Sequence, residues 1–199
     1  MPQRLIIATR NPHKVEELAA MLSESWEVRG VTALPDAPEV EETGATFEAN
    51  AALKAVAIAK ITHDWVLADD SGLEVDALDG APGVYSARYA GEHATDADNR
   101  AKLLAELEQI GARGKERTAR FRCALVLARE GQVVSTVDGR VEGVIINQEK
   151  GTGGFGYDPL FVPEGFCETF AQLPPETKHR ISHRGRALQE LRPRLAKLA

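Results

Sequence analysis

The stretch W-V-L-A-D-D-S-G, residues 65 to 72, joins a short apolar run to two adjacent aspartates. Trp65 to Ala68 is typical of a buried strand, and Asp69-Asp70-Ser71-Gly72 predicts a polar turn at its end. Adjacent carboxylates at the rim of a sheet suit a hard cation such as Mg²⁺. An Asx turn explains the same residues as well, because one aspartate can cap backbone amides while the other is solvated.

The residues before this strand begin with a strand, a turn and a helix. Leu5 to Ala8 is apolar, Thr9 or Asn11 can cap the helix that follows, and Pro12 suits its first position. Helical spacing predicts four inward residues and two outward glutamates: Val15, Leu18, Ala19 and Leu22, with Glu16 and Glu17 outside.

A second helix is predicted after the acidic, proline-containing loop from Leu34 to Gly44. Thr46 can cap the alanine-rich segment from Phe47 to Ile61. Asn50 and Lys54 lie one turn apart in this segment and share a face, where an amide and an ammonium could hold phosphates. A surface position explains each of them alone.

The residues after the strand predict a third helix, a β-hairpin and a final helix. The third helix begins near Thr95, and its inward residues are Leu103, Leu104, Leu107 and Ile110. Alternating residues from Phe121 to Leu127, with Val133 to Ile146 beyond them, predict a long hairpin. Pro193 is expected to kink or restart the C-terminal helix, whose apolar residues are Leu188, Leu191 and Leu195.

This mixture of strands and helices predicts an α/β or α+β fold. Residues 1–199 are expected to form a single domain, because no repeat, low-complexity tract or long linker separates them. The two cysteines, Cys123 and Cys167, form neither a disulfide framework nor a CxxC pair, so a reducing, cytoplasmic setting is expected. No run suits a signal peptide or membrane span, and the net charge of −6 argues against a DNA or RNA groove.

The run T-R-N-P-H-K, Thr9 to Lys14, is a candidate phosphate site. Backbone N–H groups at a helix start attract phosphate oxygens, and a lysine adds a mobile cation. The run is not a P-loop, because the required glycines are absent. A capped helix with a solvated lysine is the alternative. Glu41 and Glu42 could complete a carboxylate cluster with the aspartate pair, although acidic loops usually face solvent.

Two further clusters lie in the second half of the chain. In G-T-G-G-F-G-Y-D-P, from Gly151 to Pro159, glycines let backbone approach a ligand and Phe155 could face a base. Phe155 and Tyr157 could equally be core aromatics. Lys178 and the run Ser182-His183-Arg184 concentrate hydrogen-bond donors, for which the basic flank of a surface helix is the alternative.

Six motifs, taken in order, resemble the inosine triphosphate pyrophosphatase family, also called XTP/dITP pyrophosphatases. They are T-R-N-P-H-K, E-E-T-G-x-T-F-x-x-N-A-x-x-K-A, A-D-D-S-G-L, G-A-P-G-V-Y-S-A-R-Y-A-G, G-T-G-G-F-G-Y-D-P and S-H-R-G. The resemblance covers nearly the whole chain. It implies Mg²⁺-dependent hydrolysis of ITP, dITP and XTP to the monophosphate and pyrophosphate by a homodimer. It also implies a two-lobed α/β subunit, with an elongated mixed β-sheet flanked by helices and an active-site cleft between the lobes.

The matching motifs imply roles for individual residues. Glu42 and Asp70 would bind magnesium, and Asp70 would also be the general base. Lys54 would grip the triphosphate and Ser71 would contact the nucleotide. Thr9, Asn11 and Lys14 would grip the triphosphate too, and the open positions of the same run, Arg10, Pro12 and His13, are further expected substrate-binding residues. The residues around the purine are Phe155, Gly156, Tyr157, Asp158, Lys178, His183 and Arg184.

Such a site would select bases by their acceptors. Inosine and xanthosine offer an oxygen at ring position six, whereas adenosine offers an amino donor that would face Arg184 and His183 unpaired. Unsatisfied polar groups of this kind can discriminate by ~10⁴ or more. The expected reaction is attack on the α-phosphorus by a water that Asp70 or Asp69 orients. A phosphatase that releases orthophosphate and a non-catalytic nucleotide sensor are the alternatives.

Overall fold

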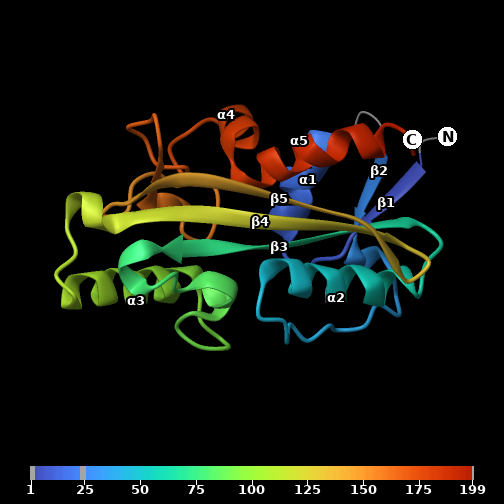
Figure 1. Cartoon of the computed structure of the whole chain (residues 1–199), viewed down its shortest axis with the longest axis horizontal. Helices are drawn as coiled ribbons and strands as arrows, with labels where there is room; N and C mark the ends of the chain where they lie inside the picture. Colours follow the sequence, from blue (N-terminus) through green and yellow to red (C-terminus); the bar gives the residue numbers. More distant parts are fainter. Residues whose placement is uncertain (1–2, 23–25, 199) are drawn as a thin grey trace. The chain divides into compact units, whose positions relative to one another are not determined.

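The computed structural model describes residues 3–22 and 26–198. Its α-helices are α1 (Pro12–Leu22), α2 (Phe47–Ala59), α3 (Asp96–Gln109), α4 (Pro175–Ile181) and α5 (His183–Leu195). Its strands are β1 (Gln3–Ile7), β2 (Trp26–Gly30), β3 (Trp65–Val75), β4 (Thr118–Arg129), β5 (Gln132–Ile145) and β6 (Phe161–Pro163). The six strands form one mixed sheet in the order β2-β1-β3-β4-β5-β6, flanked by helices, which confirms the predicted α/β class (Figure 1).

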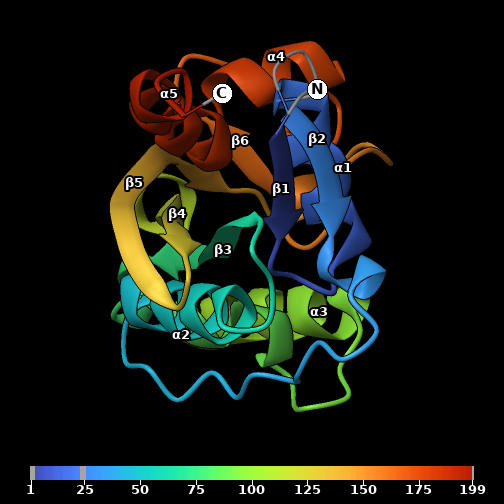
Figure 2. The same ribbon diagram turned by 90° about the vertical axis from the view of Figure 1, so that its right-hand side faces the viewer.

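Strand β1 lies between two parallel neighbours, β2 and β3. The chain reaches β2 through α1 and then reaches β3, on the other side of β1, through α2. Figure 2 shows β1 and β2 side by side, and Figure 1 shows α2 on the opposite side of β3 from α1 and α5. Ligands of open α/β sheets bind beyond the carboxyl ends of strands where the strand order reverses in this way. The Thr9 to Lys14 run starts at that edge.

The chain divides into two compact units, each with its own core. The first unit consists of Met1–Asp70, Cys123–Gly139 and Arg184–Ala199. The second consists of Ser71–Arg122 and Arg140–His183. The single domain over residues 1–199, the elongation of the sheet and the cleft between lobes stay predictions.

The core of the first unit joins α1 and α5 to the sheet. Its buried helical side chains include Leu18, Leu22, Leu188, Leu191 and Leu195, which confirms the inward positions predicted for these leucines. They pack on strand residues that include Leu5, Leu67 and Leu125. Helix α5 continues through Pro193 to Leu195, so the predicted restart of the helix there was wrong.

The core of the second unit forms around α3 and the aromatic residues of β4 and β6. Thr95 and Asp98 make a capping box at the start of α3, and Leu103 and Leu107 are fully buried. The inward position predicted for Ile110 was wrong: this residue follows the end of the helix, and its side chain is 53% exposed. The predicted hairpin is confirmed, with a two-residue turn at Glu130-Gly131 where both residues have positive φ.

Strand β3 corrects the prediction of a polar turn at residues 69–72. The strand does not end at Ala68 but continues to Val75, with Asp69 fully buried and Asp70 6% exposed. Buried carboxylates are tolerated inside a strand only when cations or donors pair with them. The cations and hydrogen-bond donors that pair with these two aspartates therefore determine which chemistry the site can perform.

None of the helices in the described ranges is both long and apolar enough to cross a membrane.

The pairing of β5 with β6 leaves no room for a side chain at Gly143. A Cβ there would lie 2.4 Å from the carbonyl oxygen of Val162 and 2.5 Å from the Phe161 ring. We expect Gly143→Ala to lower the free energy of unfolding by about 1–3 kcal/mol, measured by urea denaturation. Gly30→Ala is the control, because its nearest neighbour lies 3.4 Å away. Equal losses in the two variants would contradict this steric explanation.

Candidate active site

The loop after β1 is fixed by the cap of α1. Asn11 Oδ1 accepts hydrogen bonds from the backbone N–H groups of His13, at 2.9 Å, and Lys14, at 3.4 Å. The N–H of Asn11 donates to Thr9 Oγ1 at 3.2 Å. Of the two predicted caps, the structure therefore confirms Asn11. The cap places Lys14 in the first turn of α1, close to the end of β1.

The other three residues of this run lie on the surface. Arg10 Nη2 donates to the carbonyl oxygen of Ala37 at 3.1 Å, and His13 Nδ1 lies 3.8 Å from Glu16 Oε2. Pro12 is exposed as well. The described contacts do not bring these three residues to the aspartates of β3, and their roles toward a substrate stay predictions.

Asp69 is the centre of a buried charge network in the first unit. Lys14 Nζ lies 2.7 Å from its Oδ1. Arg184 donates from Nε to Oδ2 at 2.7 Å and from Nη2 to Oδ1 at 3.3 Å. The Cys123 thiol donates to Oδ2 at 3.1 Å. Burial opposes ionisation, yet Arg184 and Lys14 hold the pKa of Asp69 well below its usual range. This carboxylate therefore stays ionised.

Arg184 is committed to this network and is 1% exposed. Its Nη1 donates to Glu17 Oε2 at 2.5 Å. Although burial opposes its charge, Asp69 and Glu17 raise the pKa of Arg184. The outward position predicted for Glu17 was therefore wrong. The alternative that placed Arg184 on the flank of a surface helix was also wrong. The spacing of Glu17, three residues after Lys14 on one helical face, is the sequence signal that could have predicted its position.

Asp70 has a different partner, Lys54, which it shares with Glu42. Lys54 Nζ lies 2.8 Å from Asp70 Oδ1 and 2.7 Å from Glu42 Oε1, and it also donates to the Asp69 carbonyl oxygen at 3.0 Å. Asp70 Oδ2 has no hydrogen-bond partner among residues 3–22 and 26–198. Burial raises the pKa of Asp70, and Glu42 adds to this effect, while Lys54 and Lys14 oppose it. The two adjacent aspartates therefore have opposite pKa shifts.

Helix α2 presents Lys54 from a buried face. Thr46 caps the helix by accepting from the Ala49 N–H at 3.1 Å, as predicted. Asn50 is fully buried, and its Oδ1 accepts from the Gly44 N–H at 2.7 Å. A Cβ at Gly44 would lie 2.6 Å from that oxygen, so the acidic loop can approach the helix only through glycine. The surface alternative for Asn50 and Lys54 was wrong.

The second unit brings together the glycine-rich run and Lys178. Asp158 Oδ2 accepts from the Phe155 N–H at 2.9 Å and from Lys178 Nζ at 2.6 Å. That ammonium also lies 5.1 Å from the centre of the Phe155 ring. Gly154 has φ +69°, and a Cβ there would lie 2.1 Å from Asp158 Oδ2. Phe155, Asp158 and Lys178 thus form one cluster, which joins an aromatic face to a cation.

Residues outside the predicted set hold this cluster in place. The Tyr157 hydroxyl donates to the Ser86 carbonyl oxygen at 2.9 Å, and Tyr157 is a core residue, as one alternative proposed. Gly156 donates its N–H to Asp96 at 2.7 Å and accepts from Arg100 at 2.8 Å. No pattern in the sequence indicates Asp96 or Arg100, because each lies more than fifty residues from Gly156 along the chain.

His183 and Ser71 complete the predicted residues. His183 is 5% exposed, and its ring stacks on Phe121 with centroids 4.9 Å apart and planes at 13°. Phe121 in turn stacks on Phe170, whose ring centre lies 5.9 Å from the Lys178 ammonium. His183 and Lys178 therefore border one aromatic cluster. Ser71 follows Asp70 directly within β3.

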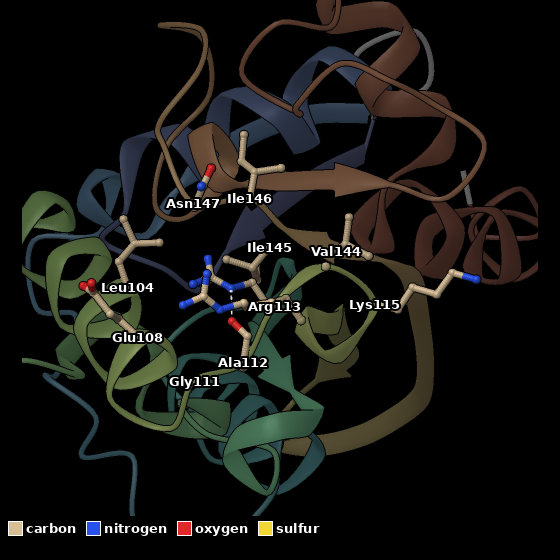
Figure 3. A pocket seen from close by; sticks show the side chains of 12 residues that line it. Leu104, Glu108, Gly111, Ala112, Arg113, Lys115, Val144, Ile145, Ile146 and Asn147 are labelled. Atoms are coloured by element: carbon tan, nitrogen blue, oxygen red, sulfur yellow. Dashed lines mark hydrogen bonds between the residues drawn. The ribbon is translucent and has the colours of Figure 1, made fainter.

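A pocket of about 820 Å³ lies elsewhere in the second unit (Figure 3). It is lined by the end of α3, the loop after it and the end of β5, with Arg113, Ile145 and Asn147 among the lining residues. None of the predicted site residues lines it, and Glu108 is its only carboxylate. The buried carboxylates of the first unit, rather than this hollow, therefore identify the candidate active site.

Comparison with known proteins shows the family of the chain. The chain matches the model of the Ham1 family over residues 5–194. It is 53% identical over 193 residues to a dITP/XTP pyrophosphatase of Geobacter sulfurreducens, with 96% of each chain covered. It is 48% identical over 187 residues to a dITP/XTP pyrophosphatase of Bacillus subtilis, which covers 94% of this chain and 93% of that one.

Solved structures also match the chain over nearly its whole length. The Ham1 protein of Staphylococcus aureus superposes with a TM-score of 0.85 at 40% identity, covering 99% of this chain and 100% of that one. A nucleoside-triphosphatase and dITP/XTP pyrophosphatase of Mycobacterium abscessus superposes with a TM-score of 0.75 at 47% identity, covering 95% and 98%.

The network around Asp69 leads to a stability prediction. Asp69→Asn removes the negative charge that pairs with buried Arg184, so we expect the free energy of unfolding to fall by about 3–5 kcal/mol. Because the pKa of Asp69 is lower when folded, this loss is complete above about pH 4 and shrinks as pH falls through the folded pKa. Urea denaturation at several pH values measures it. Asp70→Asn is the matched control, and an equal loss there would contradict the distinct role of Asp69.

Proposed function

The chain belongs to the Ham1 family and is a nucleoside triphosphate pyrophosphatase that hydrolyses deaminated purine nucleotides, and we propose that Asp70 is its catalytic carboxylate. The products are the nucleoside monophosphate and pyrophosphate. One observation supports this assignment above others: Asp70 is nearly buried beside two lysines, and one of its oxygens has no partner among the described residues. Such an oxygen can accept a proton from water.

Asp70 is a better general base than Asp69. Efficient proton transfer needs a carboxylate whose pKa lies nearer to the working pH, and burial raises the pKa of Asp70. Asp69 has a pKa well below its usual range, and its oxygens are already engaged by Lys14, Arg184 and Cys123. In the proposed step, the oxygen of a water molecule forms a bond to the α-phosphorus while the water gives a proton to Asp70. The bond to the bridging oxygen breaks, and pyrophosphate leaves.

The residues around Asp70 fit a magnesium ion. Carboxylate oxygens are the donors that Mg²⁺ prefers, and Glu42 Oε1 and Asp70 Oδ1 are of this kind, which leaves Asp70 Oδ2 for the proton. When bound, the ion would neutralise charge on the phosphate oxygens. Among the described residues no group of three or more His, Cys, Asp and Glu side chains could hold a metal. Water and substrate oxygens would therefore complete its coordination.

The triphosphate would be held by the two lysines and the start of α1. Lys14 and Lys54 are both largely buried, and each ammonium already lies on a β3 carboxylate. Positive charge placed in advance of the reaction stabilises the charge that develops on leaving pyrophosphate. Thr9 and Asn11 order the loop next to this end of the helix. Catalysis would thus consist of positioning and electrostatics, without a covalent intermediate.

The base would be recognised by the cluster in the second unit. Phe155 offers a partly exposed ring, and the Lys178 ammonium held by Asp158 can donate to an oxygen at ring position six. His183 is the second proposed donor to that oxygen. Contact between Arg184 and the base stays a prediction, because its guanidinium would have to leave Asp69 or Glu17. We also propose that the protein is a cytoplasmic homodimer and binds neither nucleic acid nor membrane.

The reaction is tested by product identity. Purified protein would be incubated with dITP, XTP, ITP, GTP and ATP, with and without Mg²⁺, and the phosphate products resolved. We expect magnesium-dependent monophosphate and pyrophosphate from the first three and little from ATP. Diphosphate with orthophosphate would instead indicate a terminal phosphatase, and binding without turnover would indicate a nucleotide sensor.

The role of Asp70 is tested by substitution. Asp70→Asn keeps the shape of the side chain but cannot accept the proton, so kcat should fall by about 10²–10⁴. Asp138→Asn, an exposed position on β5, is the control for loss of one carboxylate and should keep normal activity. Circular dichroism checks that both variants fold. Near-normal turnover by Asp70→Asn would remove Asp70 from the mechanism.

A further inference from the structure

Lys54 occupies the position between the two proposed metal ligands. Its ammonium lies 2.7 Å from Glu42 Oε1 and 2.8 Å from Asp70 Oδ1, and its third hydrogen bond goes to the Asp69 carbonyl oxygen at 3.0 Å. An ammonium has three donors, so this geometry uses all of them. The side chain is 12% exposed, which limits screening by solvent. Lys54 therefore pairs with both carboxylates at once and offsets part of their negative charge.

The surroundings hold this arrangement firmly. Asn50 fixes the acidic loop through the Gly44 N–H, two residues from Glu42, and the Thr46 cap fixes the start of the same helix. Glu42 and Lys54 are thus set on two segments that one buried amide connects. Asp70 is set by β3. The ammonium is accordingly a built part of the site and not a loosely placed surface charge.

We propose that Lys54 blocks Glu42 and Asp70 against a free divalent cation and releases them only when a triphosphate draws its ammonium away. The inference rests on the proposed function, since the triphosphate is the anion that competes for Lys54. A cation entering alone has to displace the ammonium and meets only two side-chain carboxylates. A cation that arrives with a nucleotide brings phosphate oxygens of its own, and those oxygens also give the ammonium a new partner.

This competition couples the two ligands. If the nucleotide removes Lys54 from the carboxylates, it raises the affinity for the cation, and the cation raises the affinity for the nucleotide by the same factor. The site is then loaded by the cation–nucleotide complex. A divalent cation that arrives without a nucleotide binds this site only weakly.

The experiment measures binding of Mn²⁺, as a paramagnetic substitute for Mg²⁺, to nucleotide-free protein by electron paramagnetic resonance. Lys54→Met keeps the length and apolar stem of the side chain but removes the ammonium. We expect this variant to bind Mn²⁺ at least tenfold more tightly than the wild type. Glu42→Gln added to Lys54→Met should abolish the gain, which locates it at this carboxylate pair.

Lys14→Met is the matched control. It also removes one buried ammonium near Asp70, but that ammonium lies on Asp69 and not between the proposed ligands. Its effect on Mn²⁺ affinity measures the general change in charge and should be several-fold smaller. If Lys54→Met binds Mn²⁺ no more tightly than Lys14→Met does, the blocking role is wrong.

A second measurement separates this inference from the proposed function. Wild-type protein should bind Mn²⁺ at least tenfold more tightly with a nucleotide analogue whose α,β-bridge cannot be hydrolysed. Tight Mn²⁺ binding by the wild type without any nucleotide would overturn the inference even if pyrophosphate is released from dITP normally. Failure to release pyrophosphate would instead contradict the proposed function. Thermal unfolding of each variant confirms that the folded state is being compared.

Discussion

The carboxylate of Asp69 is the constraint around which the first unit is organised. It lies fully buried in the middle of β3, where an ionised group is tolerated only with partners of opposite charge. Those partners come from α1, through Lys14, and from α5, through Arg184. The network thus ties two helices to the central strand and fixes the orientation of β3 at the next residue, Asp70. Two neighbouring aspartates thus differ in their partners and in the direction of their pKa shifts.

Local patterns in the sequence predicted much of the fold. The caps at Asn11 and Thr46, the start of α3 near Thr95 and the leucines of α1, α3 and α5 follow from interactions within one or two helical turns. The Glu130-Gly131 turn likewise needs only the residues beside it. Errors occurred where a pattern ran past the end of an element, as at Ile110, or where burial depended on distant partners. The boundary of β3 is the clearest case, because two aspartates in sequence look like a turn until their cations are known.

The site was predictable in composition but not in arrangement. Motifs identified Lys14, Lys54 and Asp70 as chemically important. No spacing in the sequence shows that Lys14 pairs with Asp69 while Lys54 pairs with the adjacent Asp70. That division depends on the register of β1 with β3 and on the path of the loop before α2. Glu17 and Cys123 were missed for the same reason, since each is significant only through contact with Asp69 or Arg184.

The order of residues in the Asp69 network affects synthesis of the protein. Arg184 follows Asp69 by 115 residues, so a nascent chain leaving the ribosome presents the aspartate and Lys14 long before the guanidinium exists. Until then the strand that carries Asp69 has only part of its compensating charge and lacks the apolar cover of α5. The first unit can therefore be completed only after Arg184 has been added to the chain, whereas the second unit needs no residue beyond His183. The unit whose residues are synthesised first is thus the unit whose last residues are synthesised second.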